Sequence, residues 1–266
     1  MDTIPAPLKD KVAIITGGSR GIGAALVRKF AENGCSHIAI TYNTNKDLAD
    51  KVLASVRELS PKIKTCAFAA DLSDPDFGPK VVEQALAGFA RDQIDIVVSN
   101  AAPNATNNLV EVELMTKKDF DFHITGSAWA SLSLAKAAIK HIPRGGRIVM
   151  ISSVASKIAF GEPTVAYSAA KAAVDSISKN LAAIWGVKYG VTVNTISVGG
   201  TLTDAMRAAI KDRGPELEKM VSDLSFLKRI GEVNEVAEIV AFVASPQAGW
   251  IVGKSETNGT QCGSIY

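Results

Sequence analysis

A buried strand that runs into a glycine-rich turn and then a helix is the feature that most restricts the fold of this chain. Residues 12–16 are apolar and β-branched, which is typical of a strand covered on both faces. Residues 17–23 hold the glycines, and residues 24–30 show the pattern of a helix. Glycines let the backbone approach a phosphate, and a helix N-terminus attracts anions. This context favours a dinucleotide-binding turn over a tight turn without a ligand.

Strand-like and helix-like segments alternate along the rest of the 266 residues. Further strands are predicted at 37–42, 64–69, 94–98, 147–151, 191–196 and 250–257, and further helices at 46–60, 77–90, 118–141, 205–227 and 232–244, with another around 167–171. Such alternation predicts right-handed βαβ units in one α/β domain over residues 1–266. We expect a doubly wound parallel sheet of about seven strands, with helices on both faces and ligands at the carboxyl ends of the strands.

Charge and composition restrict the partners of the chain. A net charge of +2 creates no global field for nucleic acid or an anionic membrane. The apolar runs fall short of the roughly 20 residues that span a bilayer, and the first 11 residues do not resemble a signal peptide. Cys35, Cys66 and Cys262 lack metal-ligand spacing. We therefore expect a cytoplasmic protein without a metal, a nucleic-acid partner or a membrane partner.

The residues after the second strand indicate which dinucleotide would bind. Many NAD-binding folds place an acid there for the ribose hydroxyls, but this chain has Tyr42 and Asn43. No carboxylate repels a 2′-phosphate, and Arg20 in the glycine turn could bind one. The sequence thus favours NADP(H), with Arg20 as a solvated turn residue as the alternative. Asp71 and Leu72 follow the third strand, where a short polar side chain could reach adenine or cap the next helix.

Tyr167 and Lys171 lie four residues apart in a predicted helix, so their side chains share one face. An ammonium beside a phenol favours the phenolate and lowers the phenol's pKa from about 10. Such a tyrosine can donate a proton to a carbonyl oxygen or accept one from an alcohol. The same spacing is common on solvated helix faces, so the motifs upstream decide its meaning.

In their order along the chain, the motifs resemble those of the short-chain dehydrogenase/reductase family, from about Leu8 to Gly259. Residues 16–23 resemble the family's TGxxxGxG turn, and residues 167–171 its YxxxK motif. Residues 99–102 resemble its NNAG segment, with Ser for the first Asn and Ala for the Gly. Residues 194–203 resemble its N…PGxxxT segment, although Val198 replaces the usual Pro, and Ser153 falls at the catalytic serine. A narrower resemblance is to NADPH-dependent fungal ketoreductases of polyketide and hydroxynaphthalene type.

The resemblance implies a single-domain Rossmann fold and an NADP-dependent oxidoreductase that reduces a ketone, or oxidises the alcohol, of a hydrophobic small molecule, with a polycyclic compound or a secondary metabolite as the candidates. Ser153 would hydrogen-bond the substrate oxygen, Tyr167 would be the general acid/base, and Lys171 would hold the nicotinamide ribose. Residues 205–227 would form a substrate lid, and the chain would form a homo-oligomer, a dimer or tetramer. The expected cofactor-binding residues are Gly17, Ser19, Arg20, Gly21, Ile22, Gly23, Tyr42, Asn43, Asp71, Leu72, Asn100, Ala101, Tyr167, Lys171, Gly199, Thr201 and Thr203.

His123 departs from the family pattern. It stands where the family has an Asn that holds a water between the lysine and solvent. A histidine can also relay protons, since its ordinary pKa is about 6.5. Three interpretations stay open: a working reductase with His123 as the catalytic relay, a slower reductase, or a non-redox cyclase, isomerase or dehydratase. A silent NADP sensor is disfavoured, because it would not need Ser153, Tyr167 and Lys171.

Overall fold

The computed structural model describes residues 6–103 and 109–258. Its centre is one seven-stranded sheet in the order β3-β2-β1-β4-β5-β6-β7, in which every pairing is parallel. The chain builds outward from β1 to β3, then returns to place β4 on the other side of β1. The expected doubly wound parallel sheet of about seven strands is confirmed.

Most of the predicted elements are present, with small shifts at their ends. The strands are β1 (Val12–Ile15), β2 (His37–Tyr42), β3 (Lys64–Ala69), β4 (Ile96–Ser99), β5 (Arg147–Ser153), β6 (Thr192–Val198) and β7 (Ser255–Asn258). The α-helices are α1 (Gly21–Glu32), α2 (Lys46–Leu59), α3 (Phe77–Phe89), α4 (Lys117–His123), α5 (Ala130–Ala138), α6 (Val165–Tyr189), α7 (Asp204–Arg213), α8 (Pro215–Asp223) and α9 (Val233–Val243). None of the helices in the described residues is both long and apolar enough to cross a membrane.

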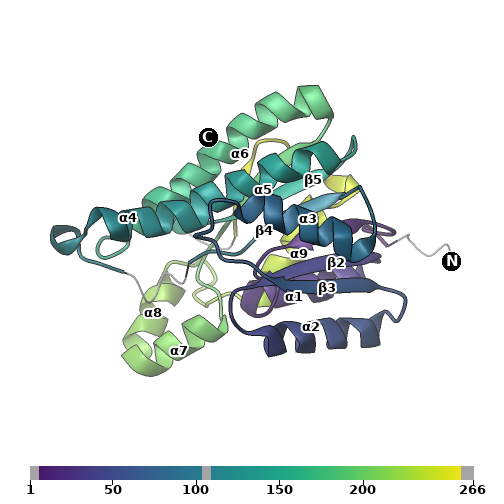
Figure 1. Ribbon diagram of the computed structural model, residues 1–266. Coiled ribbons are helices and arrows are strands. Elements are labelled where there is room, and N and C mark those ends of the chain that lie inside the picture. The colour runs from purple at the N-terminus through teal and green to yellow at the C-terminus, as the bar shows by residue number, and fades with distance from the viewer. Residues whose placement is uncertain (1–5, 104–108, 259–266) are drawn as a thin grey trace.

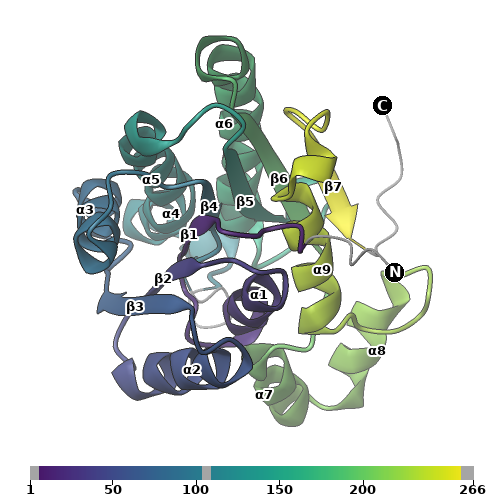
Figure 2. The same ribbon diagram turned by 90° about the vertical axis from the view of Figure 1, so that its right-hand side faces the viewer.

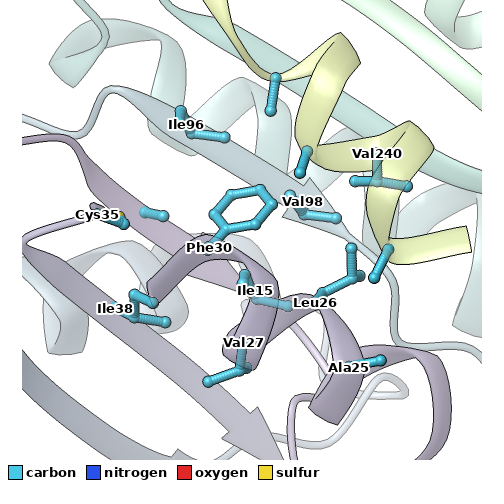
Figure 3. Close-up of a cluster of buried hydrophobic side chains, with 14 of the residues drawn as sticks. Ile15, Ala25, Leu26, Val27, Phe30, Cys35, Ile38, Ile96, Val98 and Val240 are labelled. Carbon is cyan, nitrogen blue, oxygen red and sulfur yellow. The ribbon is translucent and has the colours of Figure 1, made fainter. Parts of the chain in front are cut away.

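Helices cover both faces of the sheet. Figures 1 and 2 show α1, α2 and α9 on one face and α3, α5 and α6 on the other, and each set closes its own apolar core against the strands. On the first face Phe30 of α1 is fully buried against α9 and the strands, close to Val98 and Val240 (Figure 3). Strands β1, β4, β5 and β6 are buried along their whole length. Burial on both faces explains the nearly continuous apolar sequence of β1 and β4.

The long helix predicted at 118–141 is divided. α4 ends at His123, a π-helical turn covers Ile124–Trp129, and α5 begins at Ala130. Within the π turn, a Cβ added to Gly126 would lie only 2.2 Å from Cγ of Pro103. The backbone of this turn thus packs directly on the loop after β4, and the wider turn falls beside the carboxyl ends of the strands. Such π turns are frequent at functional sites.

The last strand, predicted at 250–257, is confined to Ser255–Asn258. The segment before it is a loop held by Asn194 of β6. The amide of Asn194 donates to the Ile251 carbonyl oxygen at 2.8 Å and accepts from the Lys254 N–H at 3.1 Å. Gly253 adopts a φ of +68°, which interrupts an extended conformation. This loop is thus held to β6 by the Asn194 side chain together with two backbone hydrogen bonds, from the Gly253 N–H to the Val193 carbonyl oxygen at 3.0 Å and from the Thr195 N–H to the Lys254 carbonyl oxygen at 2.9 Å.

The break predicted at Gly214–Pro215 in the segment 205–227 is confirmed. α7 ends at Arg213, Gly214 has a φ of +83°, and Pro215 opens α8. Proline fits the first turn of a helix because the missing N–H has no partner there anyway. The two helices lie together beside the main body of the molecule (Figure 1), and the chain enters them from the carboxyl end of β6.

Close packing between α3 and α5 should make Gly78→Ala destabilising. A Cβ at Gly78 would lie 2.2 Å from the backbone of Ser133, whereas the nearest atom to a Cβ at Gly186, in α6, is 3.9 Å away. We expect Gly78→Ala to lower the free energy of unfolding by about 1–3 kcal/mol through overpacking. Gly186→Ala should be neutral or stabilising by up to about 1 kcal/mol, because alanine favours helix. Urea unfolding followed by circular dichroism measures both, and equal effects would contradict this packing.

Candidate functional site

The glycine turn after β1 is held by β2 and folds back on itself. The N–H groups of Gly17 and Gly18 donate to the hydroxyl and the carbonyl oxygen of Thr41, both at 3.0 Å. Gly17 and Gly21 have φ values of +67° and +53°, which favour glycine. A Cβ at Gly23 would lie 2.0 Å from the carbonyl oxygen of Gly17. The three predicted glycines are therefore required by the backbone itself.

The same turn is closed from the other side by the end of β4. The hydroxyl of Thr16 accepts from the N–H groups of Asn100 and Ala101, both at 3.0 Å. The Asn100 amide donates to the Thr16 carbonyl oxygen at 2.9 Å. Asn100 and Ala101, predicted to bind a cofactor, thus lie at the turn, and the amide of Asn100 is engaged in holding it.

The first turn of α1 has no side-chain cap. Arg20 is its N-cap residue, with an exposed side chain that makes no cap hydrogen bond, and the turn contains no acid. Ser19 is buried and Ile22 partly buried. The segment after β6 reaches this turn, because a Cβ added to Gly21 would meet the methyl group of Thr203 at 3.4 Å. A helix N-terminus with free N–H groups and an adjacent arginine fits phosphate groups.

The residues predicted to lie near the adenosine part have local roles as well. Tyr42 ends β2 and is partly buried, and Asn43 follows it on the surface. The exposed carboxylate of Asp71 accepts from the N–H and the hydroxyl of Ser73, both at 2.8 Å. Asp71 therefore forms a local turn and does not cap α3. The next residue, Leu72, is partly buried against the apolar core.

The loop after β6 is ordered by its own threonines. The buried Thr201 donates its hydroxyl to the Gly199 carbonyl oxygen at 3.0 Å. The hydroxyl of Thr203 accepts from the Met206 N–H at 3.2 Å and caps α7. These three predicted residues thus shape the path from β6 into α7, beside the glycine turn.

Ser153 and Tyr167 meet at the carboxyl end of β5. Ser153 is the last residue of β5, and its hydroxyl accepts from the Ala155 N–H at 3.2 Å. Burial raises the pKa of Tyr167, and a side-chain hydrogen bond with Ser153 opposes that rise. The sequence led us to expect a lowered pKa, because helical spacing indicates a nearby lysine but not the depth at which the phenol is buried. The raised pKa keeps the phenol protonated at neutral pH.

Lys171 is buried below this pair, with 4% of its surface exposed. Its ammonium nitrogen donates to the Ile151 carbonyl oxygen at 2.8 Å and lies 5.9 Å from the centre of the Tyr167 ring. Burial lowers the pKa of Lys171 to about 8, and the charge of Asp175 opposes this. The amine is thus bound to the backbone of β5 and titrates within reach of neutral pH.

His123 lies beside Tyr167, the residue expected to transfer the proton. It ends α4 with 2% of its surface exposed. Its ring meets the ring of Tyr167 edge to face, with 6.1 Å between the centroids, and the ring of Phe122 at 5.3 Å. The fourth predicted catalytic residue therefore contacts the tyrosine through its ring.

Asp175 also belongs to this region, although it is not among the residues predicted from the sequence. It lies one helical turn beyond Lys171, with 4% of its surface exposed. Its carboxylate accepts from the Ser156 hydroxyl and the Lys157 ammonium, both at 2.6 Å. The signal was available, because Tyr167, Lys171 and Asp175 continue one spacing of four residues along the same helix face.

The two cysteines that the structure describes, Cys35 and Cys66, show no sign of a nucleophile or a metal centre. Cys35 precedes β2, at the amino ends of the strands, whereas the site lies at their carboxyl ends, and burial raises the pKa of its thiol to about 12. Burial likewise raises the pKa of Cys66 to about 11, which makes both thiols unreactive. Cys262 lies outside the described residues. Among the residues that the structure describes, no three His, Cys, Asp or Glu side chains gather as a metal site would require.

Comparison with known sequences covers nearly the whole chain. The family model described as Enoyl-(Acyl carrier protein) reductase matches residues 17–257. The short chain dehydrogenase asqE of Emericella nidulans is 38% identical over 256 residues, which are 95% of this chain and 94% of that protein. The hydroxynaphthalene reductase arp2 of Aspergillus fumigatus is 34% identical, over 93% of this chain and 90% of that protein.

Solved structures agree with the sequence comparison. A short chain dehydrogenase from Burkholderia cenocepacia, in complex with NADP, matches with a TM-score of 0.86 at 30% identity. The match covers 97% of this chain and 100% of that chain. On the family model, the relatives and the shared fold, this chain belongs to the short-chain dehydrogenase/reductase family.

Proposed function

We propose that this chain is an NADPH-dependent ketoreductase that reduces a ketone, or oxidises the matching alcohol, of a hydrophobic ring-containing molecule. The observation that carries the proposal is the meeting of Ser153 and Tyr167 beside the buried Lys171. The relatives support the class of substrate, since one of them is a hydroxynaphthalene reductase. A solved relative that holds NADP supports the cofactor.

Tyr167 is the proposed general acid. Its pKa is raised by burial, so the phenol holds the proton that a reduced carbonyl oxygen must gain. The Ser153 hydroxyl would hydrogen-bond the same oxygen and orient the carbonyl. The charged form of Lys171 would stabilise the phenolate that is left after proton transfer. When bound, NADPH supplies the hydride that adds to the carbonyl carbon and is itself oxidised to NADP⁺.

The proposed cofactor site uses the uncapped first turn of α1. The free N–H groups there would hold the pyrophosphate, and the exposed Arg20 would pair with the 2′-phosphate. Asn43 and Tyr42 would face the adenosine from the end of β2. Gly199 and Thr201, with the rest of the loop after β6, would hold the nicotinamide part. This assignment is supported by the closeness of Thr203 to Gly21.

Exposed apolar side chains support a hydrophobic substrate. Leu114 follows β4, and Phe226 and Leu227 follow α8, with 69%, 73% and 71% of their surface exposed. The segments that carry them extend from β4 and β6, the two strands beside β5. We propose that residues 205–227 form a lid whose apolar side chains cover the bound molecule. A homo-oligomer, with a dimer or tetramer as the alternatives, and a cytoplasmic location stay predictions from the sequence.

A second candidate function is a non-redox reaction, such as that of a cyclase, isomerase or dehydratase. The contact between the rings of His123 and Tyr167 favours it, because two groups that exchange protons then lie side by side. Such an enzyme would move protons on the substrate without any net oxidation. Product formation without consumption of NADPH distinguishes it from the reductase.

Tyr167→Phe should abolish most of the reductase activity. Loss of the proposed acid should lower kcat/KM by about 100-fold or more, measured as the loss of reduced-nicotinamide absorbance with a panel of cyclic ketones and quinones. Tyr189→Phe, at the far end of the same helix, removes a matched hydroxyl and should retain activity. Full turnover by Tyr167→Phe would exclude the assigned role of the phenol.

Arg20→Ala should weaken the use of NADPH more than that of NADH. A lost hydrogen bond between charged groups costs about 1.5–3 kcal/mol, so kcat/KM for NADPH should fall roughly 10- to 100-fold. Activity with NADH should change little, because NADH carries no 2′-phosphate. Arg28→Ala, on the exposed face of α1, is the matched control. An equal loss with both cofactors would argue against the proposed phosphate contact.

Lys171→Met should stabilise the protein relative to wild type more at pH 7 than at pH 10. The pKa of Lys171 is about 8 in the folded chain against 10.5 for an ordinary lysine. The unfolded chain therefore binds more protons between these values, and wild-type stability rises with pH across that window. The free energy of unfolding of Lys171→Met minus that of wild type should therefore fall by about 2–3 kcal/mol from pH 7 to pH 10.

Urea unfolding at the two pH values measures this difference. Lys188→Met, on the exposed end of α6, is the control. A relative stability of Lys171→Met that does not depend on pH would contradict the cost of burying the ammonium.

A further inference from the structure

Asp175 joins three parts of the molecule around the proposed site. One carboxylate oxygen accepts from Ser156 and Lys157, both at 2.6 Å, and the other accepts from the Ser255 hydroxyl at 3.1 Å. Ser156 and Lys157 follow the end of β5, and Ser255 begins β7. A buried carboxylate with this many donors stays ionised, and its pKa is indeed lowered by Lys157, Ser156 and Ser152 against the effect of burial.

The first link runs from Asp175 to Ser153. The Ser156 hydroxyl lies 2.6 Å from the Asp175 carboxylate and 2.7 Å from the Ser153 carbonyl oxygen, so its one proton is shared between the two acceptors and bridges them. This bridge holds the short turn in which the Ala155 N–H donates to the Ser153 hydroxyl at 3.2 Å. The orientation of that hydroxyl therefore depends on a turn that Asp175 attaches to α6.

The second link runs from Asp175 to Lys171. Both lie on the buried face of α6, and the carboxylate favours the charged amine. α6 packs against β5, β6, the turn at 154–156, α4 and the π turn. The other titratable groups on these elements that face the pair are Tyr167, His123 and Lys157. None of these three groups is a carboxylate, so the negative charge that acts on the amine comes from Asp175.

We propose that Asp175 is a positioning residue that keeps the Lys171 amine charged and fastens the Ser153 turn to the helix that carries Tyr167. Its effect on turnover rests on the proposed ketoreductase function, whereas its effect on Lys171 does not. The two links can be separated by substitution. Asp175→Asn removes the charge and keeps an acceptor oxygen, while Ser156→Ala removes the bridge and keeps the charge.

The pH profile of kcat/KM for ketone reduction tests both links. In Asp175→Asn the loss of activity at alkaline pH should begin at lower pH, because an uncompensated buried amine releases its proton more readily. In Ser156→Ala kcat should fall about tenfold, through misorientation of Ser153, while the alkaline limb stays in place. Glu238→Gln breaks a surface ion pair with Lys29 and should change neither. An unmoved alkaline limb in Asp175→Asn would overturn the inference.

A readout without turnover separates this inference from the proposed function. In the full chain labelled with ¹³C at the lysine Cε, Lys171 is the signal that is absent from Lys171→Arg. Its midpoint should lie near pH 8 in wild type and about one pH unit lower in Asp175→Asn. If that shift appears but wild type reduces no ketone, the ketoreductase proposal fails and the role of Asp175 stands. An unchanged midpoint rejects that role whatever the activity.

A third variant, Asp175→Glu, keeps the test decisive if Asp175→Asn does not fold. Asp175→Glu keeps the charge, so the Lys171 midpoint should stay close to that of wild type even where the longer side chain disturbs the turn. If Asp175→Asn does not fold, as judged by circular dichroism, Asp175→Glu and Ser156→Ala decide the question. A Lys171 midpoint in Ser156→Ala well below that in Asp175→Glu would contradict the separation of charge from turn geometry.

Discussion

The buried ammonium of Lys171 is the interaction on which the rest of the proposed site depends. A charged amine can be buried only with hydrogen bonds and a compensating charge. Here the Ile151 carbonyl oxygen accepts its hydrogen bond, and Asp175 provides the charge. The Ser152 hydroxyl adds a bond to the Lys171 carbonyl oxygen at 3.2 Å. Strand β5 and helix α6 are therefore fixed in one register, and this register sets Ser153 against Tyr167.

The parallel sheet explains why residues far apart in sequence gather at this point. The carboxyl ends of all its strands lie on the same side of the molecule, and β1, β4, β5 and β6 are direct neighbours in that order. The glycine turn follows β1, Asn100 follows β4, Ser153 ends β5 and the loop of Gly199 follows β6. The turn lies against Ala101 of the neighbouring segment after β4 and against Thr203 of the more distant segment after β6. The place of the site is thus a consequence of strand order.

Much of this arrangement was predictable from the sequence, since apolar runs mark buried strands and motif spacing marks their ends. The direction of the Tyr167 pKa shift was not, because spacing reports closeness along a helix and not burial. The π turn was missed for a similar reason: it depends on Gly126 packing on Pro103, a contact between distant segments. The loop before β7 likewise involves a contact between distant segments, the hydrogen bonds of the Asn194 side chain with Ile251 and Lys254. The unpredicted features are those that tertiary contacts decide.

The structure also changes how the substitution at His123 is interpreted. The ring of His123 contacts Tyr167 edge to face, whereas the charges around Lys171 extend in another direction, through Asp175 to Lys157. The Lys157 side chain is 26% exposed and forms its ion pair with Asp175 at 2.6 Å. Lys171 is thus electrostatically coupled to the surface along a path that does not include position 123. With His123 at this position, the charge of the amine is therefore still supported by Asp175, and the proposed reductase needs that charge to stabilise the phenolate of Tyr167.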